Sequence, residues 1–337
     1  MARESSAFVR RVRTMDPGDG PDAASLIRKH CPVSEELTRS LSSLLEQLLA
    51  DEVLNGVIVE YVFDNGAPSS MAAFGLSGFV HGELADNYLA QPSPHLALTL
   101  LHAALPGPAA PVFLGFDQIA RGNATEGLTL VPLFWLQESY DPSDPETHVL
   151  LAHALQLFFQ RHRGYRLSRI MKDVPAHLSS VHLDVGFREH WRFEEGMPLS
   201  FCPEATLQSD HFVYVATKAE SDGAWPGKAI GHLFAYLPPR CGFTRHEQQV
   251  LARAADGLTD AQIAKHLGIT VAAVSLRWRS IYNRVAGRAP SVLGLGDSSS
   301  GVRGQEKRRQ VVAFVNEHPE ELRPHAGFGR KRAGAQG

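Results

Sequence analysis

The chain has 337 residues, 44% of them hydrophobic and 20% charged, which corresponds to about two globular domains and excludes a disordered, collagen-like or coiled-coil chain. Three cysteines, far apart and odd in number, favour neither a disulfide framework nor a zinc site. The sequence also has no apolar run of roughly 20 residues and no signal peptide. Together with the cysteines, these features indicate a cytoplasmic protein without a membrane partner. The net charge of −3 is a cancellation, because residues 240–337 hold 16 Lys and Arg against 8 Asp and Glu, whereas residues 1–239 carry a net −11. A basic segment with a net +8 indicates a module that binds a polyanion, joined to an acidic domain that would repel one.

Residues 1–30 are polar and include the turn-rich DPGDGPD, so we expect a frayed start. Leucines at helical spacing after an N-cap serine, Ser34, predict a helix over 34–51. Runs rich in valine, isoleucine and aromatic residues predict strands at 55–63 and 70–80, joined as a hairpin. We then expect a helix at 95–104, a strand at 127–136, a helix at 146–162, and strands at 165–172 and 211–217. This mixture predicts an α+β regulatory or sensor domain over residues 1–239.

The most informative stretch is FTRHEQQVLARAADGLTDAQIAKHLGITVAAVSLRWRSIYNRV at 243–285. Two capping boxes start helices there, Thr244 with Glu247 and Thr259 with Gln262, and a glycine follows each helix. Thr270 caps a third, longer and basic helix. Its expected inward face consists of Val274, Trp278, Ile281 and Val285. A short helix, a glycine turn and a longer basic helix are typical of a helix-turn-helix, whose last helix enters the major groove of DNA.

This segment resembles the DNA-binding domain of the LuxR family of transcription regulators. The matching positions are Thr244, Glu247, Val250, Leu251, Ala255, Gly257, Leu258, Ile263, Ala264, Leu267, Gly268, Ile269, Val274 and Ile281. The resemblance implies an all-α domain over 240–320, with a fourth, dimerising helix at 306–318 after a long linker at 286–304. A basic flexible tail is expected over 321–337. A purely structural bundle with solvated arginines is the alternative, which the net +8 and the matched core disfavour.

By this resemblance the partners are double-stranded DNA, a second copy of the chain in a homodimer, and RNA polymerase. Base edges would be contacted by Ser275, Leu276 and Arg279, because a guanidinium can pair with both acceptors of guanine. Residues nearer the phosphates would be Lys265, Thr270, Arg277 and Arg284. The family usually has lysine where Ser275 stands and histidine where Arg277 stands, a difference that concerns the target sequence and not binding itself.

Residues 1–239 carry no motif of comparable specificity. A phosphoacceptor receiver domain is disfavoured because its acidic pair, aspartate and lysine cannot be placed. WLQESYDPSDP at 135–145 lacks the residue order of the pockets that bind acyl-homoserine lactones. The order of predicted elements shows a weaker similarity to the acetyltransferase-like (GNAT) fold, whose members hold the coenzyme A pyrophosphate on a glycine-rich turn at the start of the long helix. Here that turn would be YDPSDPETH at 140–148, which is acidic and has no glycine.

We therefore expect no enzymatic activity and no cofactor, but a domain that senses an unidentified small molecule or protein. An active acyltransferase placed by the DNA-binding tail, and a domain that only dimerises or binds a protein, are the alternatives. His148, His153 and His162 lack the helical spacing of metal ligands, so no metal is expected. GAWPGK at 223–228 lacks the spacing of a phosphate-binding loop. Finally, Tyr165, His190, Trp191 and Phe193 are candidates to line a pocket, although aromatic residues at such spacing are more often part of a core.

Overall fold

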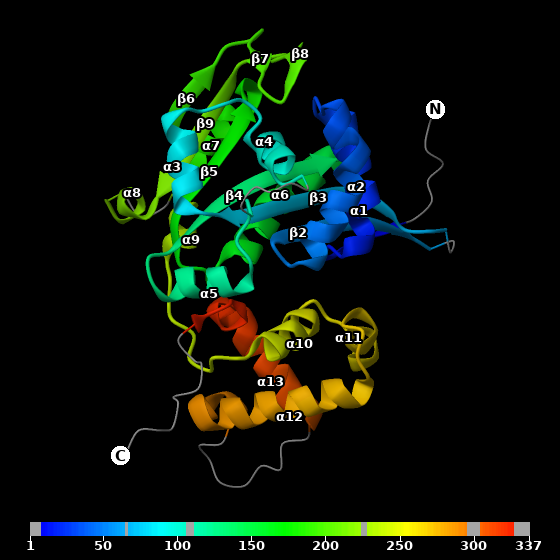
Figure 1. Cartoon of the computed structure of the whole chain (residues 1–337). Helices are drawn as coiled ribbons and strands as arrows, with labels where there is room; N and C mark the ends of the chain where they lie inside the picture. Colours follow the sequence, from blue (N-terminus) through cyan, green and yellow to red (C-terminus); the bar gives the residue numbers. More distant parts are fainter. Residues whose placement is uncertain (1–7, 65–66, 106–110, 224–227, 295–303, 327–337) are drawn as a thin grey trace. The chain divides into compact units, whose positions relative to one another are not determined.

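The computed structural model describes residues 8–64, 67–105, 111–223, 228–294 and 304–326 (Figure 1). The described chain forms two compact units, which we call the sheet unit and the helical unit. The sheet unit comprises Met1–Phe116, Leu128–His162 and Leu167–Phe234. The helical unit comprises Asp117–Gly127, Arg163–Arg166 and Ala235–Gly337, so two short stretches from earlier in the chain belong to it. No helix in the described residues is long and apolar enough to cross a membrane.

Within the described residues, the sheet unit contains a seven-stranded sheet with the spatial order β1-β2-β3-β4-β5-β9-β6. Neighbouring strands of this sheet run antiparallel, apart from β4 and β5, which are parallel. The strands are β1 (Phe8–Thr14), β2 (Leu54–Phe63), β3 (Ser70–Val80), β4 (Leu128–Gln137), β5 (Leu167–Pro175), β6 (Arg188–Phe193) and β9 (His211–Thr217). A separate hairpin pairs β7 (Pro198–Leu199) with β8 (Cys202–Thr206). The β2–β3 hairpin expected from the sequence is confirmed.

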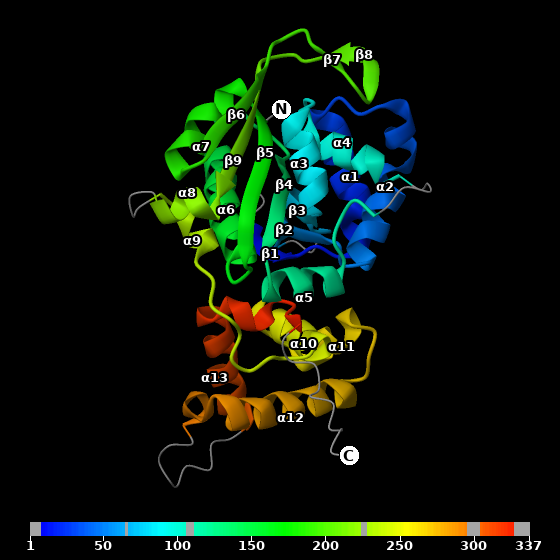
Figure 2. The same cartoon turned by 60° about the vertical axis from the view of Figure 1, so that its left-hand side comes forward.

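Helices cover both faces of this sheet (Figures 1 and 2). One face carries α1 (Gly20–His30), α2 (Glu35–Ala50), α3 (Gly82–Ala90) and α4 (Leu96–Ala103). The opposite face carries α6 (Pro145–His162), which packs on β2, β3 and β4, and α7 (Ser179–Val185). The helices α8 (Lys218–Gly223) and α9 (Gly231–Phe234) follow β9.

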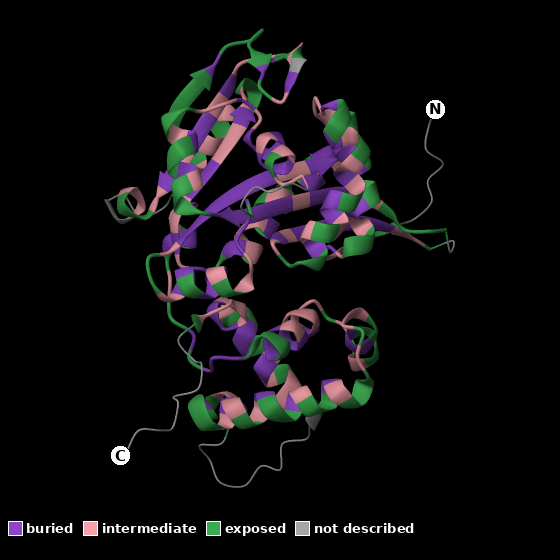
Figure 3. Ribbon diagram, in the orientation of Figure 1, coloured by how far each residue is buried: buried purple, intermediate pink, exposed green. Residues whose placement is uncertain are grey.

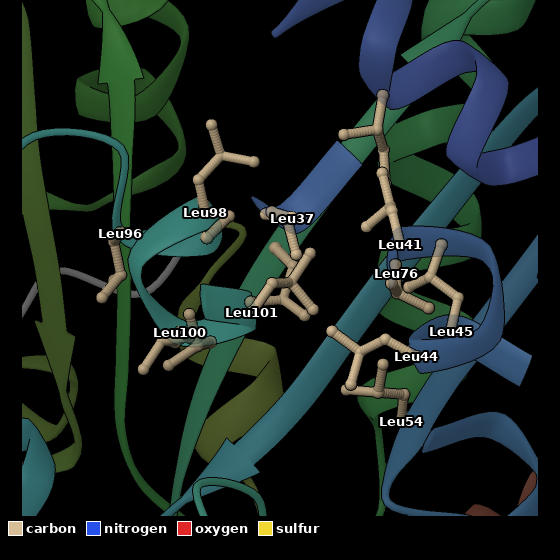
Figure 4. Close-up of a cluster of buried hydrophobic side chains, with 14 of the residues drawn as sticks. Leu37, Leu41, Leu44, Leu45, Leu54, Leu76, Leu96, Leu98, Leu100 and Leu101 are labelled. Atoms are coloured by element: carbon tan, nitrogen blue, oxygen red, sulfur yellow. The ribbon is translucent and has the colours of Figure 1, made fainter. Parts of the chain in front are cut away.

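Leucine side chains fill the space between α2, α4 and the sheet (Figure 4). Ser34 caps α2 by accepting a hydrogen bond from the Leu37 N–H, and the leucines of α2 recur on one face of the helix. The cluster consists of Leu37, Leu41, Leu44, Leu45, Leu54, Leu76, Leu96, Leu98, Leu100 and Leu101, each at most 5% exposed. Because burying one leucine contributes about 1.5–3 kcal/mol, this cluster is a main source of stability for the sheet unit.

The frayed start expected for residues 1–30 is wrong from residue 8 onward. These residues form β1, a 3-10 turn at Pro17–Asp19 and α1. The arginines of β1 are paired, since Arg11 and Arg13 both contact the buried carboxylate of Glu60 on β2, at 2.6 and 2.7 Å. The polar composition did not indicate a strand, because the two arginines pair with Glu60, which lies almost 50 positions later.

The strands β4 and β5 pair at their starts, where Leu128–Leu130 lies beside Leu167–Ile170. Beyond these residues β4 continues to Gln137 and β5 to Pro175 without pairing to each other in the described sheet. The two strands separate after Leu130, and a β-bulge at Leu133, which falls out of register with β3, follows on β4. With α6 between β4 and β5 and α7 after β5, these features give the sheet unit the GNAT-like fold that the element order predicted.

The helical unit confirms the helices expected after residue 243. Its helices are α5 (Phe116–Ala124, from Asp117 onward in this unit), α10 (Arg245–Ala255), α11 (Asp260–His266), α12 (Val271–Arg288) and α13 (Gly304–Glu317). Both capping boxes are formed, with the Thr244 N–H donating to Glu247 at 2.7 Å and the Thr259 N–H donating to Gln262 at 2.8 Å. Figure 3 shows buried and exposed residues interleaved along α12. The buried ones are Val274, Trp278, Ile281 and Val285, as expected.

The apolar face of α13 lies in the core of its own unit. Val311, Phe314 and Val315 are buried together with the cores of α10 and α12. The LuxR resemblance assigns dimerisation to this helix, so a dimer formed through α13 would use a surface of the helix other than this face. The tail expected from residue 321 begins with structure, because Glu321 is fully buried and accepts the backbone N–H groups of Arg240 and Cys241. Residues 295–303 of the expected linker and 327–337 of the expected tail lie outside the described residues.

Candidate nucleic-acid interface and ligand cavity

The turn between α11 and α12 has the geometry that the sequence predicts. Gly268 has a positive φ of 62°, which a glycine adopts without strain, and it ends α11. Thr270 then caps α12, its Oγ1 accepting a hydrogen bond from the Ala273 N–H at 3.1 Å. The two helices are thereby joined by a short turn, and one long side of α12 is left exposed.

Three of the residues expected to contact DNA lie together on this exposed side of α12. Ser275, Leu276 and Arg279 are all exposed, and Leu276 is 61% exposed despite being apolar. Lys265, at the end of α11, and Thr270, at the start of α12, are exposed as well. An apolar side chain held in solvent beside an arginine offers both a methyl contact and a guanidinium to base edges.

The other two expected residues do not lie on the exposed side. Arg277 and Arg284 occupy the flank of α12 and are half-buried. The Arg284 guanidinium contacts the Glu247 carboxylate of α10 at 3.1 Å, and Ser280 donates to the same carboxylate at 2.6 Å. Arg284 therefore holds α12 against α10.

Asp260 connects three helices of the unit. Its Oδ1 accepts hydrogen bonds from the Trp278 indole N–H at 3.1 Å and from the Arg308 guanidinium at 2.6 Å. The same guanidinium lies 5.1 Å from the Trp278 ring centroid and donates to the Leu258 carbonyl. The start of α11, the middle of α12 and α13 are thus fixed together, which sets the orientation of the exposed side of α12.

The sheet unit contains a cavity of about 820 Å³ between the sheet, α6 and α7. Small residues on β3, among them Gly75 and Ser77, leave space beneath α6. Pro132 and Phe134 line the cavity on β4 and Lys172 on β5, all beyond the point where the two strands separate. A mostly apolar cavity of this size matches the usual volume of small-molecule sites.

Lys172 and His182 are two titratable groups along this cavity whose pKa values are perturbed. Burial lowers the pKa of Lys172, an effect only partly offset by the adjacent carboxylate of Asp173. Burial, with repulsion from Lys172, lowers the pKa of His182 to about 4, so this imidazole is neutral at pH 7. Its Nδ1–H donates to the Leu178 carbonyl at 2.9 Å, and its ring stacks on Tyr214.

Ser77 and His162 form a buried pair in the cavity wall. The Ser77 Oγ lies 2.6 Å from the His162 Nε2, and the His162 Nδ1 lies 2.7 Å from the Phe158 carbonyl oxygen. Because a carbonyl only accepts, Nδ1 carries the proton and Ser77 donates to Nε2. The arrangement satisfies both polar groups, and it also has the hydroxyl–imidazole geometry of an activated nucleophile.

The start of α6 does not fit a coenzyme A pyrophosphate. The backbone N–H groups that would face such an anion are taken by carboxylates, with Ser143 donating to Asp141 at 2.8 Å and Glu146 donating to Asp144 at 2.9 Å. The Ser143 hydrogen bonds also hold the pKa of Asp141 below its usual value, so this carboxylate is ionised. A doubly charged ligand would meet fixed negative charge here.

The remaining sequence candidates are dispersed. His190 and Trp191 are exposed, Phe193 is buried in the core beside α4, Tyr165 belongs to the helical unit, and none lines the described part of the cavity. His148 and His162 do line it, but no group of three metal-ligating side chains occurs among the described residues. Lys172 and His182 were missed, although a lysine inside the apolar strand RLSRIMKDV was a usable signal.

The comparisons with known proteins agree with two unlike units. A family model described as a homeodomain-like domain matches residues 244–292, and no curated protein matches the chain. Among solved structures, Arabidopsis thaliana NAA60 in complex with acetyl-CoA is 12% identical with a TM-score of 0.35, covering 62% of this chain and 98% of that one. The Vibrio cholerae spermidine/spermine N-acetyltransferase SpeG is 12% identical with a TM-score of 0.33, covering 63% and 95%.

These values are too low to assign an activity, and the fold of the sheet unit rests on its own topology. They do correct one expectation. The prediction that the chain is not an enzyme is wrong, since it excluded an activity that this fold allows. The sheet unit has a GNAT-like fold, and the similar structures are acetyltransferases by name.

Proposed function

We propose that this chain is a DNA-binding transcription regulator of the LuxR type, whose helical unit binds duplex DNA and whose sheet unit binds an effector. The observation that carries the proposal is the exposed side of α12, where Ser275, Leu276 and Arg279 lie together in a segment of net +8. A helix presented in this way fits the major groove, and its positive surroundings favour the phosphate backbone.

In this proposal Arg279 reads a base edge, because its guanidinium is exposed in the middle of the helix. Lys265 and Thr270 lie nearer the phosphates, at the turn where α12 begins. Arg277 reaches the backbone from the flank, whereas Arg284 would have to leave Glu247 to reach a phosphate. We therefore assign Arg284 a positioning role rather than a phosphate contact.

The homodimer, RNA polymerase as a partner, and a cytoplasmic location belong to the same proposal. Because the apolar face of α13 is already buried, the dimer would form through another surface. The domain boundary between residues 239 and 240 likewise remains a prediction.

The proposal is tested by selecting duplexes that the full-length chain retains from a randomised pool. A regulator should enrich one sequence, whose two half-sites would reveal a dimer by their symmetry. Retention of all sequences alike would leave only a non-specific DNA-binding protein, and no retention at all would refute DNA binding.

A second candidate is an acyl-transfer activity of the sheet unit. The separation of β4 from β5 beside the cavity favours it, as does the hydrogen bond between Ser77 and His162. Calorimetric titration of the full-length chain with acetyl-CoA tests it directly. Saturable binding would support this candidate, whereas no heat of binding at millimolar ligand would agree with the carboxylates at the start of α6.

A further inference from the structure

The mouth of the cavity is apolar on both sides. Leu151 and Leu155 of α6, Val181 of α7 and Leu178 just before α7 line it, and these four residues are 36–53% exposed. Large apolar side chains that are exposed around one opening mark a binding site, because such an apolar patch is unfavourable in water unless a partner covers it. The opening therefore suits a ligand with a hydrocarbon body.

The lining residues carry basic but no acidic groups. Among the described residues that line the cavity there is no Asp or Glu, whereas Lys172, Arg161 and several histidines are present. Arg161 already donates to the Thr14 hydroxyl at 2.8 Å. The Lys172 amine makes no hydrogen bond or ion pair with the part of the chain that the structure describes. An ammonium held in an apolar cavity is costly, and the adjacent Asp173 carboxylate offsets that cost only partly, so a further partner of opposite charge would relieve it.

The charge count sets the kind of anion. His182 is neutral at pH 7, and Lys172 is the lysine in the described lining of the cavity, so an ammonium formed there would balance a monoanion. A pyrophosphate carries more charge, and its expected position at the start of α6 is occupied by the Asp141 and Asp144 carboxylates. A carboxylate on a hydrocarbon chain satisfies both conditions.

We propose that the cavity of the sheet unit binds a free medium-chain carboxylic acid, with the hydrocarbon chain between α6 and α7 and the carboxylate on the Lys172 ammonium. Such an acid would be the effector of the proposed regulator. Its role as a regulatory signal rests on the proposed function, whereas its binding to the cavity does not. Each further methylene that is buried should strengthen binding about four-fold until the cavity is full.

The test titrates the full-length chain with octanoate, decanoate and decanol, below their micellar concentrations, in a calorimeter. The unaltered chain should bind decanoate more tightly than octanoate and at least about ten-fold more tightly than decanol, because decanol lacks the charge. Lys172→Met keeps most of the length of the side chain but removes the amine, and it should remove that preference while decanol still binds. Lys29→Met, which replaces an exposed lysine of α1 on the opposite face, should behave like the unaltered chain.

A third variant tests the place of binding. Ala154→Phe puts a ring into the cavity from α6 and should abolish binding of both ligands, with circular dichroism verifying the fold. Equal affinity for decanoate and decanol, unchanged decanoate binding by Lys172→Met, or binding of acetyl-CoA alone would overturn the inference.

The two proposals fail separately. DNA binding without decanoate binding would refute the cavity assignment and leave the DNA-binding proposal intact. Decanoate binding with the expected Lys172 dependence, but without DNA binding, would support the cavity assignment and refute the regulator.

Discussion

The arginines of α12 differ in what they contact. Arg279 is exposed on the side of the helix that also carries Ser275 and Leu276, whereas Arg284 is held by Glu247 of α10. The first is suited to reading a base and the second to fixing a helix. Substituting each should therefore produce a different defect, although both changes remove the same charge.

Arg279→Ala should weaken binding to the selected duplex roughly 5- to 150-fold, because a bidentate contact to guanine discriminates by about 1–3 kcal/mol. Binding to unrelated duplexes should change little. Competition measured by fluorescence anisotropy gives both affinities. Arg309→Ala is the matched control, since this arginine lies on α13 and pairs with Glu306 of the same helix. Equal loss on all duplexes would show that Arg279 contacts phosphate instead.

His182 makes the stability of the sheet unit depend on pH. Its pKa is about 4 in the folded chain and near 6.5 when unfolded, so between these values the unfolded chain binds a proton that the folded chain does not. The free energy of unfolding should therefore fall as the pH is lowered from 7 to 5. This imidazole faces the Lys172 amine and stacks on the Tyr214 ring.

His182→Gln should reduce this dependence, because glutamine binds no proton in this pH range. Urea titrations followed by circular dichroism at pH 7 and pH 5 measure it as the shift of the unfolding midpoint. The shift should be smaller in the variant than in the unaltered chain. An identical shift in the two proteins would mean that His182 is solvated in the folded state.

Contacts between helices hold the DNA-binding element in place. Glu247 accepts hydrogen bonds from the Thr244 N–H and the Ser280 hydroxyl and forms an ion pair with the Arg284 guanidinium, so one carboxylate caps α10 and ties α12 to it. On the other flank, Asp260 ties α12 to α11 and α13. The orientation of the exposed side of α12 thus depends on two buried or half-buried acids rather than on α12 alone.

Arg284→Ala should destabilise the contact between α10 and α12 by about 1–2 kcal/mol, because Glu247 keeps its other two donors but loses its cation. Amide hydrogen exchange in both helices should become roughly 5- to 30-fold faster. Arg279→Ala, on the exposed side of the same helix, should leave these exchange rates nearly unchanged. Faster exchange in both variants alike would mean that the ion pair adds nothing.

The helical unit was readable from the sequence because its signals are local. A capping box spans four residues, and the buried face of α12 follows from a spacing of three and four. β1 was not readable, because Arg11 and Arg13 look like solvated charges until Glu60 is placed beside them. Sheet pairing of this kind depends on residues far apart in the chain.

The opposite charges along the chain fit two separate tasks. The first 239 residues carry a net −11 and contain the cavity, whereas the last 98 carry a net +8 and contain the exposed side of α12. An acidic sheet unit would not compete for the phosphate backbone, which leaves DNA to the helical unit.

The cavity itself was beyond the reach of the sequence. Its walls come from strands and helices between Asn55 and Ile230, and the space depends on the separation of β4 from β5. A lone lysine in β5 indicated a special position, but only its placement opposite α6 and α7 gives it a chemical meaning. The acidic start of α6, by contrast, could be predicted from the sequence, and in the structure Asp141 and Asp144 accept backbone N–H groups there.

The central claim is that the basic helical unit binds duplex DNA. The most direct measurement is the affinity of the full-length chain for a labelled duplex at a series of salt concentrations, with Lys265→Ala measured alongside. The chain should bind at low salt, and the logarithm of the affinity should fall linearly with the logarithm of the salt concentration. In the variant the slope should be reduced by about one, because one phosphate contact is lost. No measurable affinity at low salt, or an affinity that does not change with salt concentration, would contradict the claim that the helical unit binds duplex DNA.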